Sequence, residues 1–86
     1  MYRVVFTEKA LKSLKKLDVS VSKIILAWVR KNLEGCKDPR QYGKALVGNH
    51  SGQWRYRVGD YRLIAEIKDD EIVIMVLNIG HRKNIY

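Results

Sequence analysis

Three arginines recur at alternate positions around a short turn, and their guanidinium groups are suited to binding phosphate. Arg55 and Arg57 precede the dipeptide Gly59-Asp60, and Arg62 follows it. A guanidinium presents planar, bidentate donors that match a phosphate group, and it stays charged at any working pH. Three of them at this spacing predict a site for an anionic ligand.

The stretch from Gln53 to Leu63 predicts a β-hairpin that brings the arginines together. Gly59 can take the positive φ that a type II′ turn requires, or that a type I′ turn requires together with Asp60. A two-residue turn fixes the register of both strands. The expected pairs are Val58 with Tyr61, Arg57 with Arg62, Tyr56 with Leu63, and Arg55 with Ile64. Strand alternation then separates the arginines from an apolar face made of Trp54, Tyr56, Val58, Tyr61 and Leu63.

This arrangement has a cost, because like charges that face each other across a strand pair destabilise it. We expect an anionic partner to offset the cost. A solvated sheet face, whose arginines merely extend into water, is the alternative.

The composition favours a polyanionic partner. The 86 residues carry a net charge of +8, from 17 Lys and Arg against 9 Asp and Glu, which indicates nucleic acid first and an anionic membrane surface second. The length predicts a single domain over residues 1–86. No apolar run reaches membrane-spanning length, and no signal peptide precedes Tyr2. The lone Cys36 favours a reducing, cytoplasmic setting, and no His or Cys spacing indicates a metal site.

The remaining pattern predicts an α+β fold. The expected elements are a strand over residues 2–6, a helix that begins after Thr7, a second helix that begins after Asp18 or Ser20 and ends at Gly35, a loop over residues 40–51, a hairpin strand that continues to residue 68, and a last strand over residues 71–79. The last run is apolar at consecutive positions, which is typical of a strand buried on both faces.

These elements would form a helix hairpin followed by a three-stranded antiparallel meander, within a four-stranded sheet. A two-residue turn at Asp69-Asp70 would place Leu77 opposite Arg62. The tail from His81 to Tyr86 would then lie close to the arginines.

Four short motifs accompany this order of elements. They are Ala45-Leu-Val-Gly48, Trp54-Arg-Tyr-Arg57, Gly59-Asp-Tyr-Arg-Leu63 and Gly80-His-Arg-Lys-Asn-Ile-Tyr86. In order and spacing they resemble the RelE/ParE superfamily of bacterial toxin–antitoxin toxins, and the RelE branch in particular. The resemblance covers nearly the whole chain.

The resemblance implies a ribosome-dependent endoribonuclease that enters the A site and cuts the messenger RNA held there. The implied chemistry uses no metal or cofactor: the 2′-OH of a nucleotide attacks the adjacent phosphate and leaves a 2′,3′-cyclic phosphate and a 5′-OH. The matching residues are Arg55 and Arg57 for the basic pair, Arg62 for the next strand, Arg82 after the last glycine, and Tyr86 in the tail. We expect Arg57, Arg62, Arg82 and Tyr86 to be catalytic, and Arg55, Lys44 and Lys83 to bind RNA.

The resemblance does not assign the residue that acts as general base. RelE-like toxins often carry lysines where this chain has Arg55 and Arg57, and a guanidinium is a poor proton acceptor. Some relatives use a glutamate before the hairpin, but the matching region here has Lys44. His81, with an unperturbed pKa of about 6.5, is our candidate for acid or base, and a plain RNA contact or an exposed position is the alternative.

The resemblance also implies partners. These are a cognate antitoxin that covers the arginines or displaces the tail, the messenger and ribosomal RNA of the A site, and operator DNA through the toxin–antitoxin complex only; no membrane is expected. Two other functions stay open. One is a ParE-like inhibitor that blocks DNA gyrase by binding, and the other is a non-catalytic basic module that binds nucleic acid.

Overall fold

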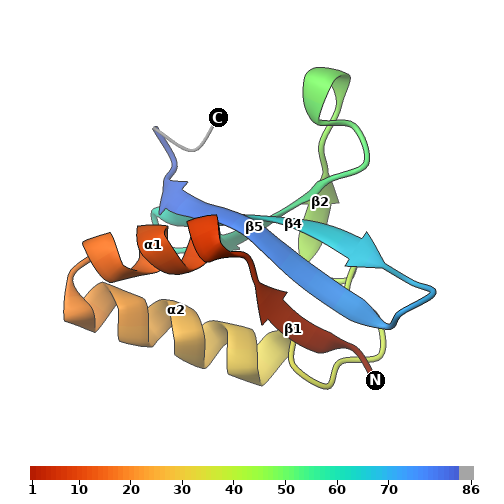
Figure 1. Cartoon of the computed structure of the whole chain (residues 1–86), viewed down its shortest axis with the longest axis horizontal. Coiled ribbons are helices and arrows are strands. Elements are labelled where there is room, and N and C mark those ends of the chain that lie inside the picture. The colour runs from red at the N-terminus through yellow and green to blue at the C-terminus, as the bar shows by residue number, and fades with distance from the viewer. Residues whose placement is uncertain (84–86) are drawn as a thin grey trace.

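The computed structural model describes residues 1–83 and contains two helices packed on one face of a five-stranded sheet (Figure 1). In chain order the elements are β1 (Arg3–Phe6), α1 (Glu8–Lys16), α2 (Val19–Asn32), β2 (Gly43–Ala45), the 3₁₀ helix η1 (Gly48–His50), β3 (Trp54–Val58), β4 (Tyr61–Lys68) and β5 (Val73–His81). The α+β prediction is confirmed. Within this part of the chain, neither helix combines the length and apolar character needed to cross a membrane.

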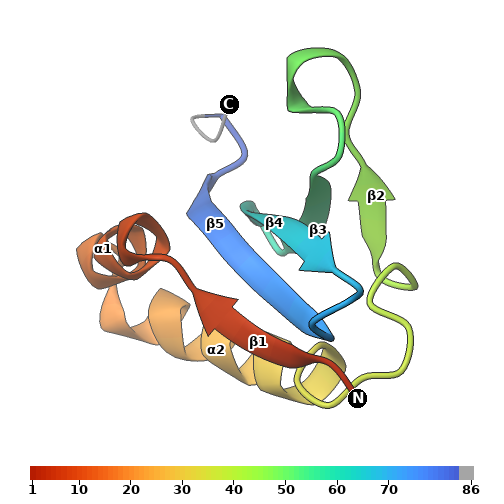
Figure 2. The ribbon, with the colours of Figure 1, turned by 45° about the vertical axis from the view of Figure 1, so that its right-hand side comes forward.

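The sheet has the order β1-β5-β4-β3-β2 (Figure 2). β1 pairs in parallel with β5, and the other neighbours are antiparallel, so the predicted meander of β3, β4 and β5 is confirmed. The expected count of four strands is wrong, because β2 adds a fifth in the segment expected to be a loop. The sequence of β2, Gly-Lys-Ala, lacks the apolar alternation that would predict a strand. β2 forms because it pairs with the edge of β3.

The ends of the helices follow the sequence signals. The side chain of Thr7 accepts a hydrogen bond from the backbone N–H of Ala10, at 3.1 Å, and so caps α1. Asp18 occupies the N-cap of α2, and Gly35 takes a φ of +76° three residues beyond the last residue of that helix. The short connection of Leu17 and Asp18 joins α1 to α2, and the two helices form the predicted helix hairpin.

The core lies between the helices and one face of the sheet. Its buried members are Ala10, Leu14, Ile25, Val29 and Leu33 from the helical half, and Tyr56, Val58, Leu63, Ala65, Ile74, Val76 and Ile79 from the strands. Both helices lie on this side of the sheet, and neither covers the opposite face (Figures 1 and 2).

The connection between β4 and β5 differs from the predicted two-residue turn. Lys68 pairs with Val73, so the turn holds four residues, and Ile72 within it has a φ of +56°. Further along, the register shifts beside Ile64 and Ala65, whose partners are Asn78 and Val76, so Leu77 is the extra residue of a β-bulge. The longer turn and the bulge together place Gly80, and not Leu77, opposite Arg62.

Candidate functional site

The β3–β4 hairpin has the predicted turn and register. Gly59 has a φ of +59° while that of Asp60 is not positive, as in a type II′ turn. The pairs are Val58 with Tyr61, Arg57 with Arg62, Tyr56 with Leu63 and Arg55 with Ile64. All four predicted pairs are confirmed, so the local turn accounts for the register that pairs Arg57 with Arg62.

Arg55, Arg57 and Arg62 lie on the sheet face that the helices leave uncovered, and we call this the arginine face. They alternate along β3 and β4 with Tyr56 and Leu63, which are fully buried in the core. Because the pair next to the turn is hydrogen-bonded, Arg57 and Arg62 form a non-hydrogen-bonded pair, whose Cα atoms lie about 4.5 Å apart. The side chains of Arg57 and Arg62 therefore leave the backbone at adjacent points on the same face of the sheet.

No carboxylate neutralises this charge within the described residues. The ion pairs of residues 1–83 join Lys12 to Glu8, Arg40 to Asp69 and Lys68 to Glu66, and none includes an arginine of the arginine face. The Nε of Arg62 is buried and has no hydrogen-bond partner among these residues. A buried donor without a partner costs free energy, so the arginine face holds charge and donors that an anion could satisfy.

Further basic residues lie around this face. Lys44 of β2 pairs with Arg55 and is exposed. The backbone N–H of Arg82 donates to the carbonyl of Asp60 at 2.9 Å, which fixes Arg82 beside the β3–β4 turn. Lys83 follows and is exposed. The chain thus brings Lys44 and Arg82 to the two flanks of the hairpin.

Gly80 is the residue of β5 that lies opposite Arg62. It faces Arg62 across β4 and β5 and contributes no side chain to the arginine face. Tyr86, the expected tail residue of the site, lies outside the described residues.

His81 is placed on the other face of the sheet. It pairs with Tyr61, and the two rings meet edge to face with centroids 5.5 Å apart. Tyr61 packs against the core, so the imidazole lies on the helix-covered side, where its Nδ1 accepts from the backbone N–H of Lys83 at 3.3 Å. The structure does not bring His81 to the arginine face, and its expected role as acid or base has no geometric support.

Tyr56 anchors β3, the strand that carries Arg55 and Arg57, from the core side of the sheet. Its side chain is fully buried, and its hydroxyl donates to the carbonyl of Pro39 in the loop between α2 and β2. Burial raises the pKa of Tyr56 above its ordinary value, so the phenol stays protonated and able to donate. β3 is thereby fixed to a loop that lies 17 residues earlier in the chain.

A second polar contact fixes the same loop to the far end of the sheet. Arg40 binds Asp69 with both terminal nitrogens, at 2.7 and 3.1 Å, and lies 5.5 Å from the ring centroid of Trp54. The Tyr2 hydroxyl donates to the same carboxylate at 2.6 Å. The Arg40 hydrogen bonds, followed by that of Tyr2, lower the pKa of Asp69 to about 2.

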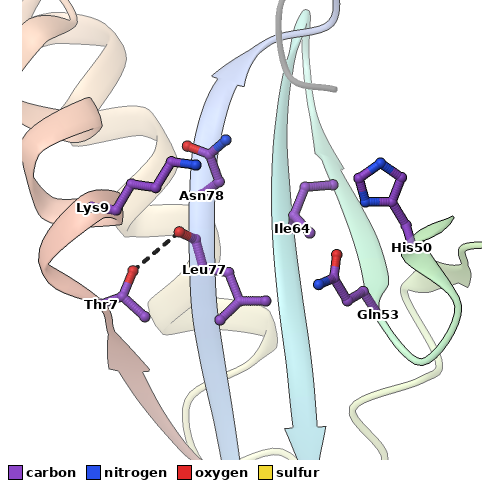
Figure 3. A pocket seen from close by; sticks show the side chains of 7 residues that line it. All are labelled: Thr7, Lys9, His50, Gln53, Ile64, Leu77 and Asn78. Carbon is purple, nitrogen blue, oxygen red and sulfur yellow. Dashed lines mark hydrogen bonds between the residues drawn. The ribbon is translucent and has the colours of Figure 1, made fainter.

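A cavity of about 490 Å³ lies beside the arginine face, and no pattern in the sequence predicts it (Figure 3). It is lined by Thr7, Lys9, His50, Gln53, Ile64, Leu77 and Asn78. These residues come from the start of α1, the β2–β3 connection, β4 and β5, so only the folded chain assembles them. Within residues 1–83, no group of three or more His, Cys, Asp or Glu side chains is placed to hold a metal ion.

Comparisons with known proteins give the family. The family model described as the ParE toxin of type II toxin–antitoxin system, parDE, matches residues 4–86. Toxin RelG of Mycobacterium tuberculosis is 31% identical over 85 residues, which cover 99% of this chain and 95% of RelG. The chain belongs to the RelE/ParE superfamily of toxins.

Solved structures of other RelE-type toxins have the same fold. The toxin–antitoxin complex RelBE2 of M. tuberculosis contains a chain that matches with a TM-score of 0.86 and 30% identity, over 94% of this chain and 98% of that one. The isolated RelE toxin of E. coli matches in fold with a TM-score of 0.72 and 23% identity, over 94% of this chain and 84% of RelE. The arginine face is thus a feature of a RelE-type toxin of a type II toxin–antitoxin system.

Proposed function

We propose that this toxin is an endoribonuclease that cuts messenger RNA in the ribosomal A site. The 2′-OH of one nucleotide attacks the adjacent phosphate, which leaves a 2′,3′-cyclic phosphate on one fragment and a 5′-OH on the other. The observation that carries the proposal is the arginine face, where Arg55, Arg57 and Arg62 have no carboxylate partner within residues 1–83.

This chemistry needs donors for the charge that grows on the phosphoryl oxygens, and guanidinium groups supply them. Arg57 and Arg62 start from directly opposed positions, so their forks can bind different oxygens of one phosphate. Arg82 joins them from beside the turn. Removing one such donor from other enzymes costs about 2.7–4 kcal/mol of transition-state stabilisation.

The other expected residues keep supporting roles in this proposal. Arg55 and Lys44, which pair across β2 and β3, bind the RNA backbone to one side of the scissile phosphate. Lys83 binds it beyond Arg82, and Tyr86 stacks on a base or donates to a phosphate. Since ribosomes and messages are cytoplasmic, the toxin acts in the cytoplasm.

A cognate antitoxin is the second part of the proposal. Related toxins were solved as complexes with antitoxins, including RelBE2 of M. tuberculosis and the archaeal RelE–RelB complex of Pyrococcus horikoshii. With a net charge of +8, this toxin offers a basic surface that an acidic or amphipathic segment can cover. We also propose that the toxin–antitoxin complex binds operator DNA and that the toxin alone does not.

The experiment compares ribosomes stalled on a defined message with the same message in the absence of ribosomes, and new ends are mapped by primer extension. We expect cleavage within the A-site codon only when ribosomes are present. Arg62→Ala should lower the cleavage rate about 10²–10³-fold. Arg30→Ala is the matched control, because Arg30 is exposed on α2, away from the arginine face, and it should keep the wild-type rate.

Three outcomes would contradict parts of the proposal. A wild-type rate in Arg62→Ala would remove the arginine face from the reaction. Equal loss in Arg30→Ala would indicate a general effect of charge. Absence of cleavage by the wild-type toxin would favour a gyrase-directed inhibitor, and inhibition of DNA supercoiling by purified gyrase would then be measured.

A further inference from the structure

The cavity beside the arginine face has the size and the lining of a ligand site. Its volume of about 490 Å³ falls within the range of roughly 300–1,000 Å³ typical of small-molecule sites. Figure 3 shows Thr7 and Lys9 on one side, His50 and Gln53 on the other, and Ile64, Leu77 and Asn78 between them. The cavity therefore lies between α1 and the β2–β3 connection, over β4 and β5.

We propose that this cavity receives one unpaired nucleobase of the RNA strand whose phosphates bind the arginine face. The inference rests on the proposed function and adds a base-reading site to it. Single-stranded RNA is recognised by bases that leave the stack and present their edges to protein side chains.

The position of the cavity relative to the arginines supports this occupant. Ile64 and Asn78 face each other across β4 and β5, two positions along the strands from Arg62 and Gly80 and on the same face of the sheet. Residues two apart on a strand are separated by roughly 7 Å. A phosphate at Arg62 would thus hold its nucleotide next to the cavity, with the base within reach of it.

The cavity offers both an apolar surface and hydrogen-bonding edges. Ile64 and Leu77 supply aliphatic contacts for the face of a base. The side-chain amide of Gln53 makes no hydrogen bond to another described residue, so its donor and its acceptor are both available. An amide can pair with a base edge through two bonds at once, and this is how Gln and Asn discriminate between bases.

Asn78 presents a fixed donor beside these groups. Its Oδ1 accepts from the hydroxyl of Ser13 at 3.3 Å and from the backbone N–H of Ile79 at 3.0 Å. These two bonds orient the amide and leave its Nδ2 without a hydrogen-bond acceptor among residues 1–83. A base carbonyl or ring nitrogen would satisfy that donor.

The charge of the lining favours a base over a cationic ligand. No aspartate or glutamate lines the cavity among the described residues, and Lys9 adds a positive charge at its side. A neutral, planar, hydrogen-bonding group attached to a phosphate fits both the cavity and the neighbouring arginine face.

The first experiment is an NMR titration of the toxin with the four nucleoside 3′-monophosphates. The signals observed are the Gln53 side-chain amide, the Ile64 methyl groups and the Nε–H groups of the arginines. Ribose 5-phosphate and inorganic phosphate are the controls that lack a base. We expect nucleotides to shift all three sets of signals, and the controls to shift those of the arginines alone.

The result that would overturn the proposal is a nucleotide titration that moves the arginine signals while Gln53 and Ile64 stay unchanged. The same conclusion follows if no nucleotide shifts any signal, or if the controls move Gln53 and Ile64 as far as the nucleotides do.

The second experiment compares cleavage profiles on messages that carry each base in turn at the A-site positions. Gln53→Ala should change the relative cleavage rates of the four bases about fivefold or more, as expected when a two-bond base contact is lost. Gln41→Ala is the matched control, because Gln41 is an exposed glutamine of the α2–β2 loop that does not line the cavity, and its profile should be that of the wild type.

The two proposals fail in different ways. If the wild-type toxin cuts the message and Gln53→Ala leaves the cleavage profile unchanged, the proposal of a base-binding cavity is wrong and the proposal of nuclease activity is kept. If the wild-type toxin cuts no message, the nuclease proposal fails, and the NMR titration still decides whether the cavity holds a base.

Discussion

The buried hydroxyl of Tyr56 offers a quantitative test of how the arginine face is held in place. Tyr56 stands between Arg55 and Arg57 on β3, with its ring in the core and its hydroxyl bonded to the Pro39 carbonyl. Tyr56→Phe removes one oxygen and keeps the ring, which packs 6.0 Å from that of Trp28, centroid to centroid. The substitution therefore isolates the hydrogen bond from the packing.

The magnitude follows from what Tyr56→Phe leaves behind. Pro39 is fully buried, so its carbonyl has no access to water once the hydroxyl is gone. An unsatisfied buried acceptor costs about 1–3 kcal/mol of folding free energy. In a protein of this size each kcal/mol lowers Tm by about 4–8 °C.

Thermal and urea unfolding, followed by circular dichroism, measure this loss. Tyr42→Phe is the matched control, because Tyr42 is 48% exposed and its hydroxyl bonds to no described residue. We expect the control to change the free energy of unfolding by less than about 0.5 kcal/mol. Equal stability of Tyr56→Phe and Tyr42→Phe would show that the bond to Pro39 contributes nothing and would refute the reasoning.

Two further stability predictions concern the ends of the sheet. Thr7→Ala should lower the free energy of unfolding in urea by about 1 kcal/mol, since it removes the cap on Ala10 and a 3.1 Å hydrogen bond donated to the Leu77 carbonyl; an unchanged urea midpoint would contradict it. The hydrogen bonds from Arg40 lower the folded-state pKa of Asp69 to about 2. The ionised Asp69 side chain therefore stabilises the fold fully above its unfolded pKa of about 3.9, and this stabilisation is lost as pH falls toward 2. The difference in Tm between wild type and Asp69→Asn should therefore shrink from pH 6 to pH 2, and a difference that does not vary with pH would exclude this ion pair as its source.

The arginine face was predictable because its determinants are local. A glycine in a two-residue turn and a period-2 alternation fix which residues of the hairpin face each other. The signals span only eleven residues, from Gln53 to Leu63, and no contact from elsewhere in the chain is needed to interpret them.

The register between β4 and β5 was not predictable in the same way. Asp69-Asp70 has the composition of a tight turn, but the structure adds two residues, and Ile72 takes a positive φ that its side chain disfavours. The bulge at Leu77 lies within a run of apolar residues, where one extra residue leaves no trace in the pattern. The longer turn and the bulge each change which residue of β5 lies opposite a given residue of β4. Both changes together place Gly80 opposite Arg62.

The cavity and β2 depend on contacts between distant segments. Gly43–Ala45 becomes a strand because β3 presents a free edge, and the connection that follows carries Gln53 to the side of β4. Lys9 reaches the same cavity from the other end of the sequence. Spacing within a single element carries no information about such a site.

The two histidines show what the shifted register means for catalysis. A guanidinium does not accept a proton near neutral pH, so the arginine face can bind and stabilise phosphate but cannot take the proton of a 2′-OH. The imidazole expected on the tail, that of His81, lies against Tyr61 on the helix-covered side. The other imidazole of the chain, that of His50, lines the cavity beside Ile64 (Figure 3). The β-bulge at Leu77 thus turns the expected acid or base away from the arginine face, whose guanidinium groups are left to bind and stabilise phosphate.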